Sequence, residues 1–343
     1  MHLSDFDYEL PEELIAQHPL ERRDASRMLV LNRETRTYED SKFSELPAYI
    51  RTGDVLVVNN TRVFPARLNG ERDPSGGRVE VLLVREIDAA TWSALARPSH
   101  RLKPGSHIKF GDAHRAEIVR DLEGGQKLLR FEGQSLEFLI DEHGQTPLPP
   151  YIRRPGGTSV DDRERYQTVF ARERGAIAAP TAGLHFTPEV IESVRALGAN
   201  VVEITLHVGY GTFEPVRVDE VERHHVASEF FKIEKEAALK INESKARGGR
   251  VIAVGTTTTR ALESAVNAAG EVEAGARETE LTILPGFKFR VTDALLTNFH
   301  LPCSSLLLLV SAFAGRDLTL EAYRHAVAAR YRFYSYGDCM FMI

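Results

Sequence analysis

The feature that most constrains the fold of this sequence is a change of hydrophobic period, because residues 70–150 differ from the residues on either side. Within this segment apolar and polar residues alternate over short stretches, which is the period of a strand with one buried face. The stretches are 79–87, 92–98, 107–110, 116–122 and 126–131, and the turns between them contain PSGG, KPG, FGD and EGG. Short strands at regular spacing predict an antiparallel sheet or a small barrel. The Pro- and Gly-rich run 147–157 then predicts a linker.

Beyond about residue 165 the pattern becomes strand, loop and helix in repetition. The expected strands there are 175–179, 200–208, 250–255 and 291–297, and a further strand of the same domain is expected at 54–58. The best-defined helix follows Thr187, a good N-cap, starts at Pro188 and stops before Gly198. Such alternation is typical of an α/β domain with a largely parallel sheet. We therefore predict an α/β domain of residues 1–68 and 151–343, interrupted by an inserted all-β, barrel-like domain of residues 69–150.

Charge and cysteine content exclude several classes of protein. The 343 residues include 43 Lys and Arg against 49 Asp and Glu, for a formal net charge of −6, and this balance does not by itself suggest a nucleic-acid partner. Two cysteines, Cys303 and Cys339, are too few for a disulfide scaffold or a cysteine-built zinc site. The most apolar run, LLLLV at 306–310, is far shorter than the roughly 20 residues that span a bilayer. We expect a cytoplasmic, monomeric protein without a membrane segment.

Polar residues follow four of the expected strands. They are Asn59, Asn60, Thr61 and Arg62; Thr181 and His185; Thr256, Thr257, Thr258, Thr259 and Arg260; and Asn298 and His300. Ligands of open α/β sheets bind beyond the carboxyl ends of the strands, so neighbouring strands would bring these loops to one cleft. The alternative is that the Thr and Asn residues only cap helices. The run GTTTTR at 255–260 opens a helix, where a carboxylate or phosphate can bind, but no P-loop is present and ATP is not expected.

Four further features are open to a functional interpretation. Gly209 and Gly211 resemble part of a Rossmann methyltransferase glycine loop, although the third glycine is missing; His207, just before them, is either a hydrogen-bonded core residue or a catalyst. His224, His225 and Glu229 lack the spacing of a metal site, so no metal is expected. The C-terminal run 329–338 is either a final core strand or a set of aromatic and arginine side chains for a base and a phosphate. Residues 97–115 hold five Lys or Arg against one acid, which is either a basic patch or a solvated face.

Several long runs resemble the S-adenosylmethionine:tRNA ribosyltransferase-isomerases of queuosine biosynthesis. They are LVVNNTRVFPARL (56–68), YQTVFARERGAIAAPTAGLHFT (166–187), LHVGYGTFEPV (206–216), RVIAVGTTTTRALES (250–264), PGFKFRVTDALLTNFHLP (285–302) and YRFYSYGD (331–338). Two departures stand out: Asn60 replaces the usual Asp, and Val226 with Ala227 replaces the usual Met-His pair. The resemblance implies an α/β domain that carries an inserted β-barrel-like domain.

The resemblance also implies a reaction. The acceptor would be tRNA carrying 7-aminomethyl-7-deazaguanine at the wobble position of the anticodon. S-adenosylmethionine would be a co-substrate that donates its ribosyl group, which is rearranged to give epoxyqueuosine while adenine and methionine leave. No bound cofactor and no metal is implied. A Rossmann-type RNA methyltransferase and a non-catalytic tRNA-binding protein remain the alternatives.

The chemistry of that reaction suggests roles for the candidate residues. An ammonium and a carbon beside the sulfonium must lose protons and adenine must gain one, which histidine does near neutral pH. We expect the acid–base residues to be His185, His207 and His300, supported by Glu229 and Asp338, without an assignment of which does what. The helix start at Thr256–Arg260 would hold a methionine carboxylate or a tRNA phosphate, and Arg332, Tyr334 and Tyr336 would contact the flipped-out wobble base. The remaining expected substrate-binding residues are Asn59, Thr61, Arg62, Thr181, Gly209, Gly211 and Asn298.

Overall fold

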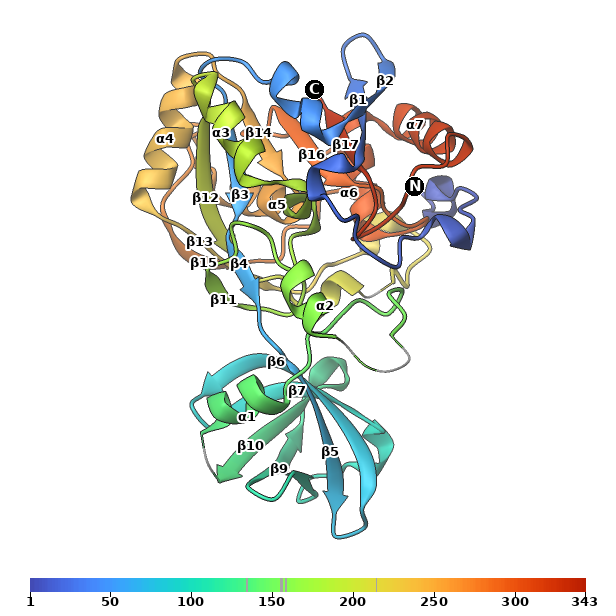
Figure 1. Cartoon of the computed structure of the whole chain (residues 1–343), viewed down its shortest axis with the longest axis vertical. Helices are drawn as coiled ribbons and strands as arrows, with labels where there is room; N and C mark the ends of the chain where they lie inside the picture. The colour runs from blue at the N-terminus through green and yellow to red at the C-terminus, as the bar shows by residue number, and fades with distance from the viewer. Residues whose placement is uncertain (134, 155–156, 158, 214) are drawn as a thin grey trace. The chain divides into compact units, whose positions relative to one another are not determined.

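The computed structural model describes residues 1–133, 135–154, 157, 159–213 and 215–343, which form two compact units (Figure 1). The larger unit consists of Met1–Arg62, Pro150–Arg153 and Arg165–Ile343, and the smaller one of Val63–Pro149 and Arg154–Glu164. Val63–Leu68 and Arg154–Glu164 thus group with the smaller unit. The domain bounds drawn from the sequence, residues 69–150, stay a prediction. Residues 155 and 156 of the expected linker lie outside the described residues.

The larger unit is built on a nine-stranded mixed sheet. Its strands are β1 (Arg27–Asn32), β2 (Thr37–Lys42), β3 (Val55–Asn59), β12 (Asn200–Leu206), β13 (Glu229–Ile233), β14 (Val251–Val254), β15 (Gly275–Thr279), β16 (Ala294–Asn298) and β17 (Cys339–Met342). They lie in the order β15-β13-β12-β3-β14-β16-β17-β1-β2. The run β12-β3-β14-β16 is parallel throughout, and β17 pairs parallel with β1. The flanking pairs β15–β13, β13–β12 and β1–β2, as well as β16–β17, are antiparallel. The predicted α/β class is confirmed, with the parallel pairing concentrated in the centre of the sheet.

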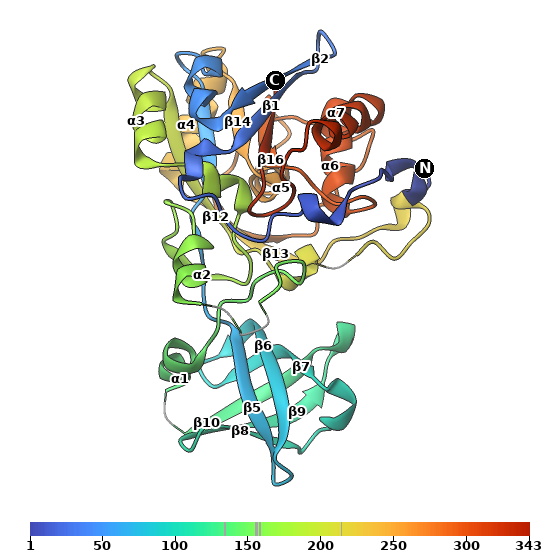
Figure 2. The same ribbon diagram turned by 45° about the vertical axis from the view of Figure 1, so that its right-hand side comes forward.

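Helices cover both faces of this sheet, which explains why its central strands are apolar without alternation. The helices of the unit are α3 (Pro188–Ala196), α4 (Lys235–Ala246), α5 (Thr256–Ala265), α6 (Ser305–Ala314) and α7 (Arg316–Ala328), and α2 (Val160–Arg165) leads into it. Leu56, Ile252 and Leu296 share one core cluster with α3, through Ile191 and Val194. Helices α4 and α5 also pack on β3, β12 and β14, and α6 packs against α7 (Figure 2).

Helix ends follow the expected chemistry at α3 and depart from it at α5. The Thr187 hydroxyl accepts a hydrogen bond from the Val190 N–H at 3.4 Å and Pro188 is the first helical residue, as predicted. The run RALESAVNAAG predicts a helix that continues to Gly270. Helix α5 instead ends at Ala265, because Val266 adopts an extended conformation and forms a β-bridge with Val272.

The structure differs from the expected strands in three places. The expected strand 175–179 is β11 (Glu173–Ala176), which pairs with β4 (Thr61–Val63) within the segment expected to be a loop. The Asn60 carbonyl accepts from the N–H groups of both Arg172 and Glu173, and these bonds place β11. Residues 329–338 are not a strand, since Arg330 and Tyr334 have φ angles of +55° and +73°; the final strand, β17, begins after them.

The smaller unit is a closed antiparallel barrel, as the alternating stretches predicted. Its strands are β5 (Arg67–Asp73), β6 (Gly77–Asp88), β7 (Thr91–Arg97), β8 (His107–Phe110), β9 (His114–Asp121) and β10 (Lys127–Gly133), and helix α1 (Leu136–His143) follows them. The sequence missed β5, whose Gly70 lies so close to β8 that a Cβ there would come within 2.6 Å of the Lys109 carbonyl oxygen. Among the described residues, no helix is both long and apolar enough to cross a membrane.

Candidate active site

A cavity with about 590 Å³ of space, its open mouth included, lies at the carboxyl ends of the parallel neighbours β14 and β16. We call it the active-site cavity, because its position and size are those of ligand sites in open α/β sheets. It brings together six of the predicted site residues: Thr181, Thr256, Thr257, Asn298, His300 and Tyr334. Tyr151 and Tyr166 also line it and were missed. The only local signal for Tyr151 was an aromatic residue within a Pro-rich run.

The C-terminal loop reaches this cavity because β17 pairs with β16. Cys339 lies opposite Asn298 in the sheet, so the residues before Cys339 lie beside the carboxyl end of β16. The Tyr334 N–H donates to the Phe299 carbonyl at 3.1 Å, and the Tyr334 ring meets that of Tyr151 edge-on, with 3.9 Å between centroids. Two aromatic rings thus form one wall of the cavity.

Asp338 holds this loop in place. Its Oδ1 accepts from the Arg27 N–H at 2.9 Å and its Oδ2 from the Arg332 N–H at 2.8 Å. The carboxyl group is 2% exposed, and burial raises its pKa despite these bonds. Asp338 is not among the residues that line the cavity, so its contacts are those of a residue that orders the loop.

His300 is the histidine that lines the active-site cavity. Its Nε2 lies 3.0 Å from the Thr297 hydroxyl, while Nδ1 has no hydrogen-bond partner in the described part of the chain. Burial lowers the pKa of His300 to about 3, so the imidazole is neutral near pH 7. In the tautomer whose Nε2–H donates to the Thr297 hydroxyl, Nδ1 is the nitrogen that can accept a proton from a bound molecule.

His185, by contrast, has both ring nitrogens hydrogen-bonded within the protein. Nε2 lies 3.2 Å from Asn298 Nδ2, and Nδ1 lies 2.7 Å from Ser26 Oγ. The Asn298 amide nitrogen also faces the carbonyls of Tyr334 and Asp338, which can only accept, so Nδ2 donates to His185. His185 is therefore the neutral tautomer with its proton on Nδ1. Burial, followed by the charges of Arg332 and Arg23, lowers its pKa to about 3.

The hydroxyls of the first turn of α5 divide into two groups. Thr256 and Thr257 line the active-site cavity. Thr258 and Thr259 instead donate to the carbonyls of Val254 and Gly255, four residues back, at 2.8 and 3.1 Å. These two side chains satisfy the turn between β14 and α5, leaving Thr256 and Thr257 to face the cavity.

Arg260 and Glu229 form a buried ion pair away from that helix start. Arg260 Nη1 donates to Glu229 Oε2, and Glu229 Oε1 accepts from the Gly209 N–H at 2.9 Å. The two side chains are 9% and 4% exposed. They line a separate cavity with about 470 Å³ of space, together with Gly211 and Ala227. The predicted residues Gly209, Gly211, Glu229 and Arg260 thus gather here rather than in the active-site cavity.

The predicted residues after β3 support neighbouring strands. The Asn59 amide donates to the Leu206 carbonyl and accepts from the Leu206 and Thr61 N–H groups, at 2.9 to 3.1 Å. The Thr61 hydroxyl lies 2.8 Å from His207 Nδ1, and burial lowers the pKa of His207. Arg62 is exposed. None of these four lines the active-site cavity.

The other two C-terminal candidates lie nearer to His185. Tyr336 is buried with its ring edge-on to Tyr166, at 5.9 Å between centroids, and lines a third cavity together with His185. Arg332 donates from Nη2 to the His18 carbonyl, and its Nη1 is buried without a partner among the described residues.

Part of the positive charge of the expected basic patch is balanced by an acid outside it. Lys109 and Arg115, of the expected basic patch, both pair with Asp73 on β5, which the count over residues 97–115 did not include.

Asn60 donates to Glu203 Oε2 at 3.3 Å, a bond that a carboxylate at this position could not donate when ionised. Within the described residues, no three His, Cys, Asp or Glu side chains are grouped to hold a metal ion.

The G-x-G segment does not continue as the methyltransferase interpretation requires. That interpretation needs an α-helix directly after the glycines, and the structure has a single 3₁₀ turn at Tyr210–Phe213.

Three comparisons with known proteins each match nearly the whole length of the chain. The family model described as "Queuosine biosynthesis protein" matches residues 3–342. Proteins named "S-adenosylmethionine:tRNA ribosyltransferase-isomerase" from Syntrophotalea carbinolica and Desulfitobacterium hafniense are 51% and 50% identical, each over 100% of both chains. A crystal structure of an S-adenosylmethionine tRNA ribosyltransferase from Thermotoga maritima is 39% identical over 99% of this chain and 100% of its own, with a TM-score of 0.57.

Proposed function

The chain belongs to the queuosine biosynthesis protein family and is an enzyme, and we propose that it is an S-adenosylmethionine:tRNA ribosyltransferase-isomerase acting in the cytoplasm as a monomer. Its acceptor in this proposal is the aminomethyl group of 7-aminomethyl-7-deazaguanine at the wobble position of a tRNA. The ribosyl group of S-adenosylmethionine is transferred to that amine and isomerised, so that epoxyqueuosine-tRNA, adenine and methionine are the products.

The observation that carries this proposal is the composition of the active-site cavity in a chain that matches the family from residue 3 to residue 342. The two aromatic rings of Tyr151 and Tyr334 offer a stacking surface for a base. The first turn of α5, at Thr256 and Thr257, offers N–H groups and a positive dipole end for the methionine carboxylate. Both features suit a nucleoside that carries an amino acid.

His300 is the residue we propose for proton transfer within this cavity. The aminomethyl ammonium must lose a proton before its nitrogen attacks, and the carbon beside the sulfonium must also lose one. In this proposal neutral His300 donates from Nε2 to the Thr297 hydroxyl, so that its Nδ1 accepts the proton. We propose that His185 positions Asn298, since both of its nitrogens are hydrogen-bonded, and that Asp338 and Glu229 keep their loops in place.

A single assay tests the proposed reaction. The protein is mixed with S-adenosylmethionine and tRNA carrying the 7-aminomethyl-7-deazaguanine base, and released adenine is measured beside the modified nucleoside. The proposal expects one adenine for each epoxyqueuosine formed. Methyl transfer to the tRNA would instead support a methyltransferase, and tRNA binding without adenine release would support a non-catalytic binding protein.

A further inference from the structure

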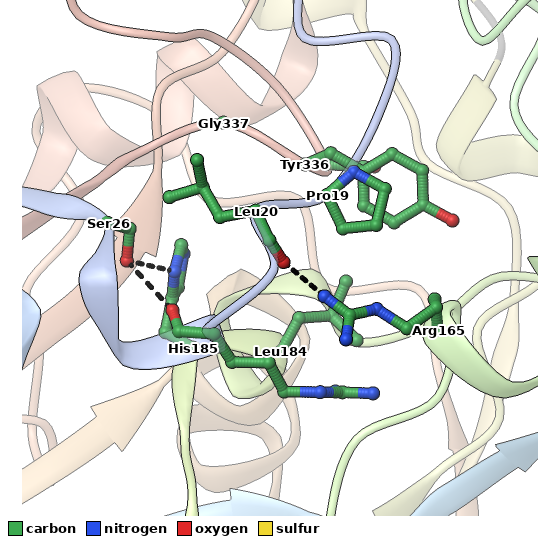
Figure 3. Close-up of a pocket in the computed structure, with 10 residues that line it drawn as sticks. Pro19, Leu20, Ser26, Arg165, Leu184, His185, Tyr336 and Gly337 are labelled. Atoms are coloured by element: carbon green, nitrogen blue, oxygen red, sulfur yellow. Dashed lines mark hydrogen bonds between the residues drawn. The ribbon is translucent and has the colours of Figure 1, made fainter.

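The third cavity, with about 320 Å³ of space, is lined by His185, and we call it the arginine pocket (Figure 3). Three segments distant in sequence form it, contributing Arg23 and Ser26, Arg165 and His185, and Ser335 and Tyr336. Among the described residues that line it, two are arginines, three carry hydroxyls, and none is an Asp or a Glu. The lining therefore favours an anion.

Both arginines donate to backbone carbonyls, which are neutral acceptors. Arg165 donates to the backbone carbonyls of Leu20 and Glu21, and Arg23 Nη1 donates to the Gln167 carbonyl at 2.6 Å. These bonds fix the directions of the guanidinium groups without cancelling their charge. Burial, followed by the charge of Arg165, lowers the pKa of Arg23, as expected for like charges in a partly buried site.

A third guanidinium adds to the positive potential. Burial lowers the pKa of His185, and the charges of Arg332 and Arg23 lower it further, so both guanidinium groups act on a ring that lines the pocket. An anion bound in the pocket would relieve this repulsion, and guanidinium groups match phosphate oxygens in geometry.

We propose that the arginine pocket binds a phosphodiester group of the RNA substrate, held by Arg165 and Arg23. The inference rests on the proposed function, which supplies an RNA as acceptor. The methionine end of S-adenosylmethionine is the other source of an oxyanion in the reaction. That end carries an ammonium and a sulfonium beside its carboxylate, so its net charge is positive, and a lining with two arginines and no acid disfavours it.

The pocket is next to the active-site cavity. Ser335 lines both, and the hydrogen bond between His185 and Asn298 joins a residue of one to a residue of the other. A nucleotide with its base in the active-site cavity would bring its backbone toward this neighbouring pocket. The pocket would then fix the position of the RNA strand without contacting the reacting atoms.

The test uses the full chain and four variants. Arg165→Gln and Arg23→Gln each remove one charge, Arg165→Lys keeps the charge, and Arg195→Gln is the matched control, an exposed arginine of α3 that pairs with Glu192. Binding of the modified tRNA is measured from about 50 to about 200 mM salt, because the affinity that comes from phosphate contacts changes strongly over this range. The KM of S-adenosylmethionine and the thermal unfolding midpoint are measured for each variant.

We expect the two pocket Gln variants to bind tRNA about tenfold more weakly and to lower the slope of log Kd against log salt by about one, with Arg165→Lys close to wild type. Their KM for S-adenosylmethionine should not change, and Arg195→Gln should match wild type throughout. If Arg165→Gln unfolds early, Arg23→Gln provides the same comparison.

Two results would overturn the proposal. One is wild-type tRNA affinity and salt slope in both pocket Gln variants. The other is a raised KM for S-adenosylmethionine with unchanged tRNA binding, which would assign the pocket to the methionine carboxylate. Because tRNA binding is measured apart from adenine release, a wild-type protein that binds tRNA but releases no adenine would contradict the proposed function and leave this comparison intact.

Discussion

The side-chain amide of Asn298, at the carboxyl end of β16, donates to His185 Nε2 at 3.2 Å, across 113 residues of sequence. Asn298 Oδ1 accepts from the Thr181 hydroxyl at 2.9 Å, and His185 Nδ1 lies 2.7 Å from Ser26 Oγ. This chain of bonds leaves His185 no free nitrogen for a substrate. It separates the two histidines of this region by role, since only His300 has a ring nitrogen available to the active-site cavity.

His300→Ala should lower turnover by about 10²- to 10⁴-fold while tRNA affinity is retained, because it removes the proposed proton acceptor. Adenine release under saturating substrates measures the effect, and His143→Ala, which removes an exposed histidine of the barrel, is the control. Turnover within tenfold of wild type would reject this role for His300.

His185→Ala separates a positioning role from a proton-transfer role. Loss of two buried hydrogen bonds should destabilise the fold by roughly 1–3 kcal/mol, measured by urea unfolding. If His185 transfers a proton, turnover should fall by about 10²- to 10⁴-fold. If it positions Asn298, His185→Gln should recover much of the lost turnover, since its amide nitrogen and oxygen can pair with Ser26 and Asn298. Full activity of both variants would exclude both roles.

Stability should fall in mild acid because of the same histidines. A pKa lowered to about 3 in the folded state means that the unfolded chain, with histidine pKa near 6.5, binds more protons between these values. The free energy of unfolding should therefore be fully present above about pH 6.5 and decrease as pH falls toward 3. Urea titrations across this range should show a shallower decrease for His185→Gln than for wild type. Parallel curves for the two proteins would contradict the prediction.

Removing one member of the Glu229–Arg260 ion pair should be costly. Glu229→Gln leaves the Arg260 guanidinium, 9% exposed, without its carboxylate, and breaking a buried pair costs about 3–5 kcal/mol. The double variant Glu229→Gln with Arg260→Gln should lose less stability than the two single variants together, which a double-mutant cycle measures. Additive losses would show that the pair is not coupled.

Gly175→Ala should displace His207. A Cβ at Gly175 would lie 2.7 Å from the His207 ring, whose Nδ1 is 2.8 Å from the Thr61 hydroxyl. We expect destabilisation of roughly 1–3 kcal/mol from this overpacking. Adding His207→Ala should remove the overlap, so the double variant should be less destabilised than the single effects predict. Equal melting of Gly175→Ala and wild type would mean that the ring moves freely.

Asn60→Asp would restore the residue that the family usually has. The new carboxylate would face Glu203 in place of a donor, so we expect a loss of roughly 0.5–1 kcal/mol at pH 7. Repulsion raises the pKa of the folded-state carboxyl, so the loss should be present above the unfolded pKa and shrink as pH falls toward 4. Unfolding curves at both pH values measure it, and a loss that grows in acid would disprove the account.

Part of the fold could be predicted from local sequence patterns. Alternation over 79–131 predicted the barrel strands β6 to β10, and the Thr187-Pro188 pair predicted the start of α3, because period and capping depend on neighbouring residues. Strands β1, β2, β4, β5, β13 and β15 were missed. Thr61–Val63, for example, is stabilised by pairing with Glu173–Ala176, more than a hundred residues away. The C-terminal loop resembled a strand in composition, but positive φ angles at Arg330 and Tyr334 exclude one.

The sequence by itself determined the fold class, the inserted barrel and the residue types at the carboxyl ends of the strands. Only the tertiary structure decided which of those residues meet. Thr181, Asn298 and His300 share a cavity because β14, β16 and β17 are neighbours, whereas Glu229 and Arg260 pair elsewhere. The physical reason is that strand order and burial are set by packing between distant segments. The same packing keeps His185 neutral and brings Arg23 and Arg165 together, which no local pattern in the chain encodes.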